Sequence, residues 1–123
     1  MTNKADKLVI IATYAEESPD KATIPFVMGS AALAMDVEVT IILQVTGVYL
    51  ALKGYVDHVH ASGFPPLTEL QAAFFEEGGT LFVCSPCIQA RKIDPQDLIP
   101  QATVIAGATL VLEILSATNV VTY

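Results

Sequence analysis

Apolar runs without polar alternation recur along this chain, and segments with helical spacing separate them. Residues 7–13 and 37–45 are rich in Val and Ile, as expected for strands that are covered on both faces of a parallel sheet. Residues 80–84, 102–106 and 119–123 predict three more strands. The pattern therefore predicts a five-stranded, mainly parallel sheet.

Helices are predicted between these strands. Ser18-Pro19-Asp20 has the chemistry of a helix start, and helical spacing continues to Met35, although Pro25 predicts that the regular helix begins or bends there. Further helices are expected over 48–53, 67–77, after 84 and over 108–117, and a loop is expected over 54–66. This order predicts a single domain, residues 1–123, folded as a three-layer α/β/α sandwich of flavodoxin-like layout.

The chain is poor in charged residues, which make up 15% of it against about 25% in average soluble proteins. Its surface must therefore be unusually apolar, and exposed apolar patches tend to mark interfaces between subunits. We expect a homo-oligomer. The net charge of −7 argues against direct nucleic-acid binding, which depends on clustered Lys and Arg.

No uncharged apolar run approaches the ~20 residues that a membrane-spanning helix needs, and the segment Met1 to Lys7 is polar. We therefore expect no membrane span and no export signal, which predicts a cytoplasmic protein. Thiols stay reduced in that compartment. A closely spaced cysteine pair there is more often catalytic, redox-active or metal-binding than a structural disulfide.

The only two cysteines lie in the segment Cys84-Ser85-Pro86-Cys87, where a predicted strand gives way to a helix. Ligands of open α/β sheets bind outside the carboxyl ends of the strands, so Cys84 lies at a suitable edge. If Ser85 caps the helix, Cys87 takes its second position, where free amides and the helix dipole favour a thiolate. Arg91 then lies one turn beyond, either favouring an anionic sulfur or simply solvated.

Other interpretations of the pair stand beside this one. The thiols are inert and buried as small apolar groups, or they bind zinc with His58 and His60. These histidines lack zinc-finger spacing and no nucleotide-binding motif occurs, so we predict no metal and no cofactor. Tyr14, Glu16 and Thr46 follow the first two strands and are candidates to line the same crevice.

Segments in both halves of the chain carry a family resemblance. They are Asp20-Lys21-Ala22-Thr23, the small-residue segment Gly29 to Met35, Val37 to Ile42, Leu81-Phe82-Val83-Cys84 and the basic pair Arg91-Lys92. Together they resemble the DsrE/DsrF-like family, which includes small sulfur-relay subunits of the TusD type, over nearly the whole length. Ile93 stands where a glycine is common, and Cys87 has no counterpart in the simplest carriers.

The resemblance implies a compact α/β fold, assembly into homo- or hetero-oligomers, and a persulfide carried on Cys84 between donor and acceptor proteins. Our hypothesis is a cytoplasmic sulfurtransferase or sulfur carrier in which Cys84 accepts sulfane sulfur and Cys87 resolves the persulfide as a disulfide. The helix-terminus argument favours Cys87 as the nucleophile instead. The alternatives are a thiol-disulfide redox protein and a non-catalytic oligomeric binding or scaffold protein.

Overall fold

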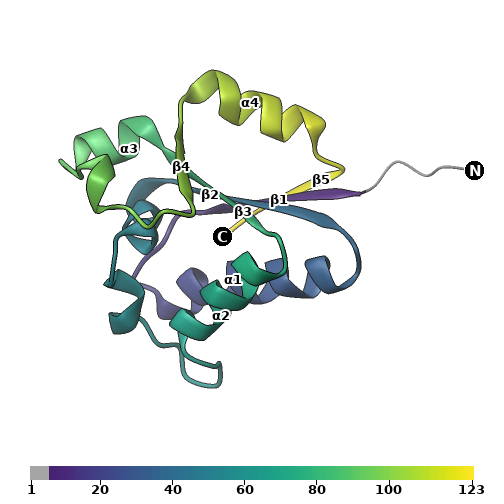
Figure 1. Cartoon of the computed structure of the whole chain (residues 1–123), viewed down its shortest axis with the longest axis horizontal. Helices are drawn as coiled ribbons and strands as arrows, with labels where there is room; N and C mark the ends of the chain where they lie inside the picture. Colours follow the sequence, from purple (N-terminus) through teal and green to yellow (C-terminus); the bar gives the residue numbers. More distant parts are fainter. Residues whose placement is uncertain (1–5) are drawn as a thin grey trace, which may run out of the picture.

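Residues 6–123, the part of the chain that the computed structural model describes, form a five-stranded sheet with helices on both faces (Figure 1). The strands are β1 (Lys7–Ala12), β2 (Glu38–Leu43), β3 (Thr80–Cys84), β4 (Ala102–Ile105) and β5 (Asn119–Thr122). The helices are α1 (Pro19–Ala34), α2 (Leu67–Glu76), α3 (Ser85–Ala90) and α4 (Gly107–Ser116), with 3₁₀ helices η1 (Val45–Ala51), η2 (Tyr55–His58) and η3 (Pro95–Asp97). Every neighbouring pair of strands is parallel, which confirms the predicted fold class.

The strands lie in the order β4-β3-β2-β1-β5. The chain therefore moves outward from β1 to β4 and then returns to place β5 on the other side of β1. Ala12 pairs with Leu43, and Leu43 pairs with Val83, so β1, β2 and β3 end side by side. This edge brings together three loops that are far apart in the sequence, which is where ligands of parallel sheets bind.

One face of the sheet is covered by α1 and α2 and holds the main core (Figure 1). Strand side chains such as Ile10, Ile41 and Leu81 pack there with Phe26 of α1 and Phe74 of α2. The two rings meet edge to face with centroids 5.6 Å apart, a favoured aromatic geometry. Burial of these aliphatic and aromatic side chains fixes the positions of the three central strands.

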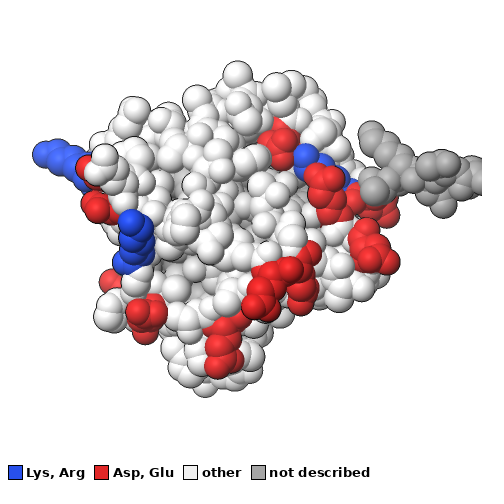
Figure 2. Space-filling view, in the orientation of Figure 1, with Lys and Arg blue, Asp and Glu red and all other residues white. Residues whose placement is uncertain are grey.

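The opposite face is covered mainly by α4 and buries a smaller cluster around Val9, Ile42 and Ile105. Large apolar side chains of α4 and β5 stay exposed there, and we call them the α4 patch: Val111, Leu112, Leu115 and Val120. Figure 2 shows that the surface above the sheet, around α4, is mostly uncharged. None of the helices within residues 6–123 is long and apolar enough to cross a membrane.

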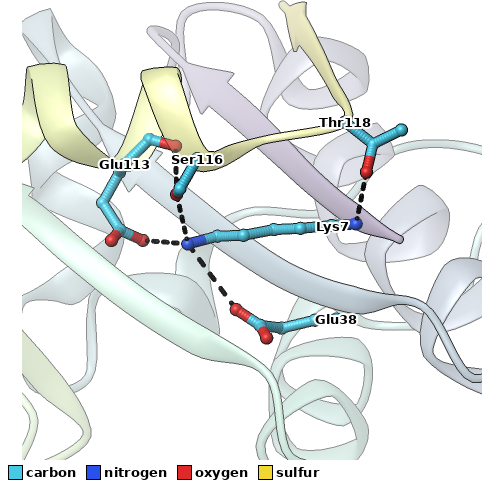
Figure 3. A network of polar contacts seen from close by, with 5 residues as sticks. All are labelled: Lys7, Glu38, Glu113, Ser116 and Thr118. Atoms are coloured by element: carbon cyan, nitrogen blue, oxygen red, sulfur yellow. Dashed lines mark hydrogen bonds and ion pairs between the residues drawn. The ribbon is translucent and has the colours of Figure 1, made fainter. Parts of the chain in front are cut away.

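Lys7 connects α4 to the sheet through a network of polar contacts (Figure 3). Its Nζ lies 3.0 Å from Glu113 Oε1 and donates to Ser116 Oγ at 3.0 Å, and a weaker ion pair joins it to Glu38 at 3.6 Å. The Lys7 backbone N–H donates to Thr118 Oγ1 at 2.9 Å. The Lys7 side chain is largely buried, so these partners compensate for the loss of water around its charge.

Two helix predictions need correction. Helix α1 begins at Pro19 and continues through Pro25, so the regular helix does not begin at Pro25. The carbonyl that loses its helical partner there belongs to exposed Lys21, where water can satisfy it. Helix α3 begins one residue earlier than expected, with Cys84 rather than Ser85 as its N-cap, because β3 turns into the helix without a connecting residue.

Candidate functional site at the carboxyl edge of the sheet

The two thiols lie where β3 turns directly into α3. Buried Leu81 and Val83 hold β3 within the sheet, which carries Cys84 to its carboxyl edge. Cys84 is the N-cap of α3 and Cys87 is the third helical residue, so one turn brings the two cysteines close together. Both thiols are free. Cys84 is only 9% exposed, whereas Cys87 is half-buried.

Burial raises the pKa of the Cys84 thiol above its ordinary value, because loss of water disfavours the anion. A hydrogen bond with the Cys87 thiol raises this pKa further, whereas the Cys87 backbone amide and the charge of Arg91 act to lower it. The net result is a thiol that holds its proton at neutral pH. Cys84 is therefore a weak nucleophile before any partner or substrate binds.

The Cys87 sulfur accepts a hydrogen bond from the backbone N–H of Val45, with 3.3 Å between N and Sγ. Val45 is the first residue of η1 and has a φ of 55°, a left-handed conformation that β-branched residues rarely adopt. The loop after β2 thereby turns a donor toward the loop after β3. A donor in this position interacts more strongly with an anionic sulfur than with a neutral thiol.

Arg91 follows α3 and folds back along it, as the predicted spacing of one turn requires. Its Nη1 donates to the carbonyl of Cys87 at 3.2 Å. The guanidinium charge acts to lower the pKa of both the Cys84 thiol and the Glu17 carboxyl group. Arg91 therefore acts electrostatically on both the thiol segment and the loop after β1.

Glu17 and Thr46 join the loops that follow β1 and β2. The Thr46 hydroxyl contacts the Glu17 carboxylate and lies 3.1 Å from the carbonyl of Thr13. The second carboxylate oxygen accepts from the N–H of Ala15 at 2.7 Å. Partial burial acts to raise the pKa of Glu17, but the hydrogen bonds from Thr46 and Ala15 outweigh it and hold that pKa below its ordinary value. These hydrogen bonds hold the Glu17 carboxylate between the loops that follow β1 and β2.

The structure places the three predicted lining residues in different surroundings. Thr46 follows Val45 directly and belongs to the site. Tyr14 packs instead under the Lys21 ammonium of α1, 4.6 Å from its ring centroid. Exposed Glu16 donates its backbone N–H to the Tyr55 hydroxyl at 3.3 Å. The carboxylate that contacts Thr46 belongs to Glu17 instead.

Two residues of the site were missed by reasoning from sequence. Glu17 carried a signal, because it follows the same strand as Glu16 and carries the same charge. Val45 carried none, because its role comes from a backbone amide and an unusual φ, and an apolar side chain shows neither.

His58 and His60, the zinc ligands considered from sequence, are exposed residues at η2 and the loop that follows it. The Nε2 atom of His60 lies 3.1 Å from the carbonyl of Phe64. Across residues 6–123, no three His, Cys, Asp or Glu side chains gather closely enough to hold a metal ion.

Comparison with known families gives one match that spans the described chain. The model of the DsrE/DsrF-like family matches residues 6–123. Two proteins of Methanocaldococcus jannaschii are similar in sequence over 95% of this chain. The uncharacterized protein MJ0760 is 37% identical, and the match spans 42% of its length; the uncharacterized protein MJ0989 is 32% identical, and the match spans 99% of its length.

Solved structures share the fold at low sequence identity. The ychN protein from E. coli has a TM-score of 0.80 at 18% identity, over 96% of this chain and 99% of its own. BT1422 from Bacteroides thetaiotaomicron has a TM-score of 0.68 at 16% identity, over 96% of this chain and 95% of its own. At such identities the likeness extends to the fold alone.

Proposed function

Because the chain belongs to the DsrE/DsrF-like family, we propose that it is a cytoplasmic sulfur-handling protein. It carries sulfane sulfur as a persulfide on the Cys84/Cys87 pair and passes it to a partner protein. The observation that carries this proposal is the placement of both free thiols at the carboxyl edge of the sheet, beside an amide donor and the charge of Arg91. The role of Cys84 as acceptor, implied by the family resemblance, stays a prediction.

The chemistry needs no cofactor. A thiolate of the pair attacks the outer sulfur of a donor persulfide, a new sulfur–sulfur bond forms on the protein, and the donor leaves as a thiol after taking up the proton. An acceptor thiol later removes the outer sulfur by the same exchange. Alternatively, the second cysteine attacks the inner sulfur of the persulfide, so that a Cys84–Cys87 disulfide forms and hydrogen sulfide leaves. Each step balances without an external oxidant or reductant.

The test is intact mass spectrometry of reduced protein after incubation with a small-molecule persulfide such as glutathione persulfide. Wild-type protein is expected to gain the mass of one sulfur atom, or to lose two hydrogens where the disulfide forms. Cys84→Ser and Cys87→Ser should keep the added sulfur longer, because neither has a resolving thiol. The Cys84→Ser/Cys87→Ser protein is the control and should gain nothing.

Failure of wild-type protein and both single variants to gain sulfur would overturn the proposal. Disulfide formation in wild-type protein without any sulfur adduct in the single variants would favour the second candidate, a thiol-disulfide redox protein. The observation that supports this alternative is that two free thiols lie within one turn of α3.

We also propose that the protein forms a homo-oligomer through the α4 patch. The patch joins exposed apolar side chains of α4 and of the edge strand β5, and Leu115 is 75% exposed. Exposed apolar surface of this kind is typical of a subunit interface. Such an interface leaves the carboxyl edge near Cys87 available to donor and acceptor proteins.

A further inference from the structure

The backbone of Val45 is strained, and its side chain gives no reason for the strain. Its φ of 55° lies in the region that glycine or asparagine adopts readily and valine avoids. The side chain is 49% exposed, so core packing does not compensate for the conformation. What the conformation does produce is the direction of the amide, which points to the Cys87 sulfur at 3.3 Å.

The surrounding residues hold Val45 in this conformation. Leu43 before it and Val48 after it are completely buried. Gly47 donates its N–H to the Gln44 carbonyl at 2.9 Å and closes a tight turn around Val45. Strained backbone that persists because its neighbours fix it is typical of functional sites.

We infer that Val45 is a positioning residue whose backbone amide orients the Cys87 sulfur and stabilises the negative charge that this sulfur carries as it reacts, so that Cys87 is the thiol at which sulfane sulfur enters the site. The inference rests on the proposed function and adds the order of events and the class of donor, a persulfide. Exposure supports the same order, because Cys87 is half-buried whereas Cys84 is almost inaccessible.

In the entry step, the Cys87 sulfur attacks the outer sulfur of the donor persulfide. The bond from Cys87 to that sulfur forms while the sulfur–sulfur bond of the donor breaks, and the donor leaves as a thiol with the proton that Cys87 gave up. Cys84 then gives its proton to water and attacks the same outer sulfur as a thiolate, and Cys87 leaves as an anion to which Val45 again donates. Total thiols, persulfides and electrons are conserved in both steps.

The direct test follows the Val45 amide in ¹H–¹⁵N NMR spectra of Cys84→Ser protein as the pH is raised. The chemical shift of the Val45 amide should change over the same pH range in which the alkylation rate of Cys87 rises. In the Cys84→Ser/Cys87→Ser protein the shift should disappear. A Val45 signal that ignores the ionisation of Cys87 would overturn the inference.

Two substitutions test the amide by reactivity. Val45→Pro removes the N–H and forbids positive φ, and it should slow alkylation of Cys87 at pH 7 by at least about tenfold, as loss of a hydrogen bond to an anion predicts. Val45→Gly keeps the N–H donor and should slow the alkylation of Cys87 less than Val45→Pro does. Asp36→Gly is the matched control, since Asp36 also has a positive φ of 61° but lies after α1, away from the thiols.

A folded Val45→Pro protein with the wild-type alkylation rate would contradict the inference. If that variant does not fold, the NMR titration decides alone. Sulfur loading separates the two proposals: Cys84→Ser should take up sulfur at Cys87 faster than Cys87→Ser takes it up at Cys84. If no variant takes up sulfur, the proposed function fails, while the NMR result still decides whether Val45 senses the Cys87 anion.

Discussion

Two cysteines separated by only two residues have different surroundings in this protein. Cys84 closes a strand and is enclosed by the core, whereas Cys87 occupies the first turn of α3 and meets the amide of Val45. Burial raises the pKa of the Cys84 thiol, whereas the Cys87 sulfur is more exposed and accepts a hydrogen bond from the Val45 N–H. A pair arranged in this way can divide entry and storage of sulfur between its two thiols.

The pH dependence of Cys84 follows from its burial. Its pKa lies above the ordinary value of 9.0, so in Cys87→Ala protein its alkylation rate should keep rising beyond pH 9, since only the thiolate reacts. Rates measured by mass spectrometry between pH 6 and about 10.5 check this expectation. A plateau below pH 9 would show that the sulfur is far better solvated or stabilised than its burial indicates.

Among the elements, the loop after β2 contributes most to the geometry of the site. Gly47 lets η1 pack directly on the end of β1, because a Cβ atom at this position would overlap the carbonyl oxygen of Ala12. The same close approach places Thr46 against Thr13 and Glu17. The loop after β2 therefore contacts residues that follow β1 as well as residues that follow β3.

Gly47→Ala should disturb this contact. Overlap with backbone that is itself paired in a sheet has no easy relief, so we expect a loss of about 2 kcal/mol in the free energy of unfolding, together with slower alkylation of Cys87. Denaturant unfolding and alkylation rates measure the two effects. Gly107→Ala is the control, because a Cβ there meets nothing within 4 Å, and its stability should stay within about 0.5 kcal/mol of wild type.

Element order and the position of the thiols could be predicted from sequence because both follow from apolar runs and from the rule that parallel strands end at one edge. The strand Thr80–Cys84 was predicted with both its limits. The exact start of α3 was not, because whether Cys84 or Ser85 caps the helix depends on how tightly the strand turns. The role of Val45 could not be predicted from sequence either, because its backbone conformation is imposed by buried neighbours on either side.

For the molecule as a whole, the unequal cover of the two faces is the reason why we propose that this chain, with its few charges, associates with a second copy. Main-core residues fill the face under α1 and α2, and the other face leaves apolar side chains in contact with water. Burying the α4 patch between subunits removes this area from water, which favours association.

Size-exclusion chromatography with light scattering should give wild-type protein a mass that is a multiple of 13.1 kDa. Leu112→Glu should shift it toward the monomer, because a charge in an apolar interface loses its hydration. Met35→Glu serves as the matched control, since Met35 is also exposed but follows α1 on the other side of the sheet. A monomeric wild-type protein, or equal dissociation by both variants, would contradict an interface at the α4 patch.

The polar network of Lys7 has a consequence for local opening of the fold. β5 and α4 are held by a short strand pairing, a small apolar cluster, the largely buried Lys7 ammonium group and the hydrogen bonds of Tyr123, whereas β2 and β3 are enclosed by the main core. The C-terminal unit should therefore detach in sub-global fluctuations while the thiol edge stays intact. Proteolytic nicking at that end would leave the contact between the Val45 amide and the Cys87 sulfur in place.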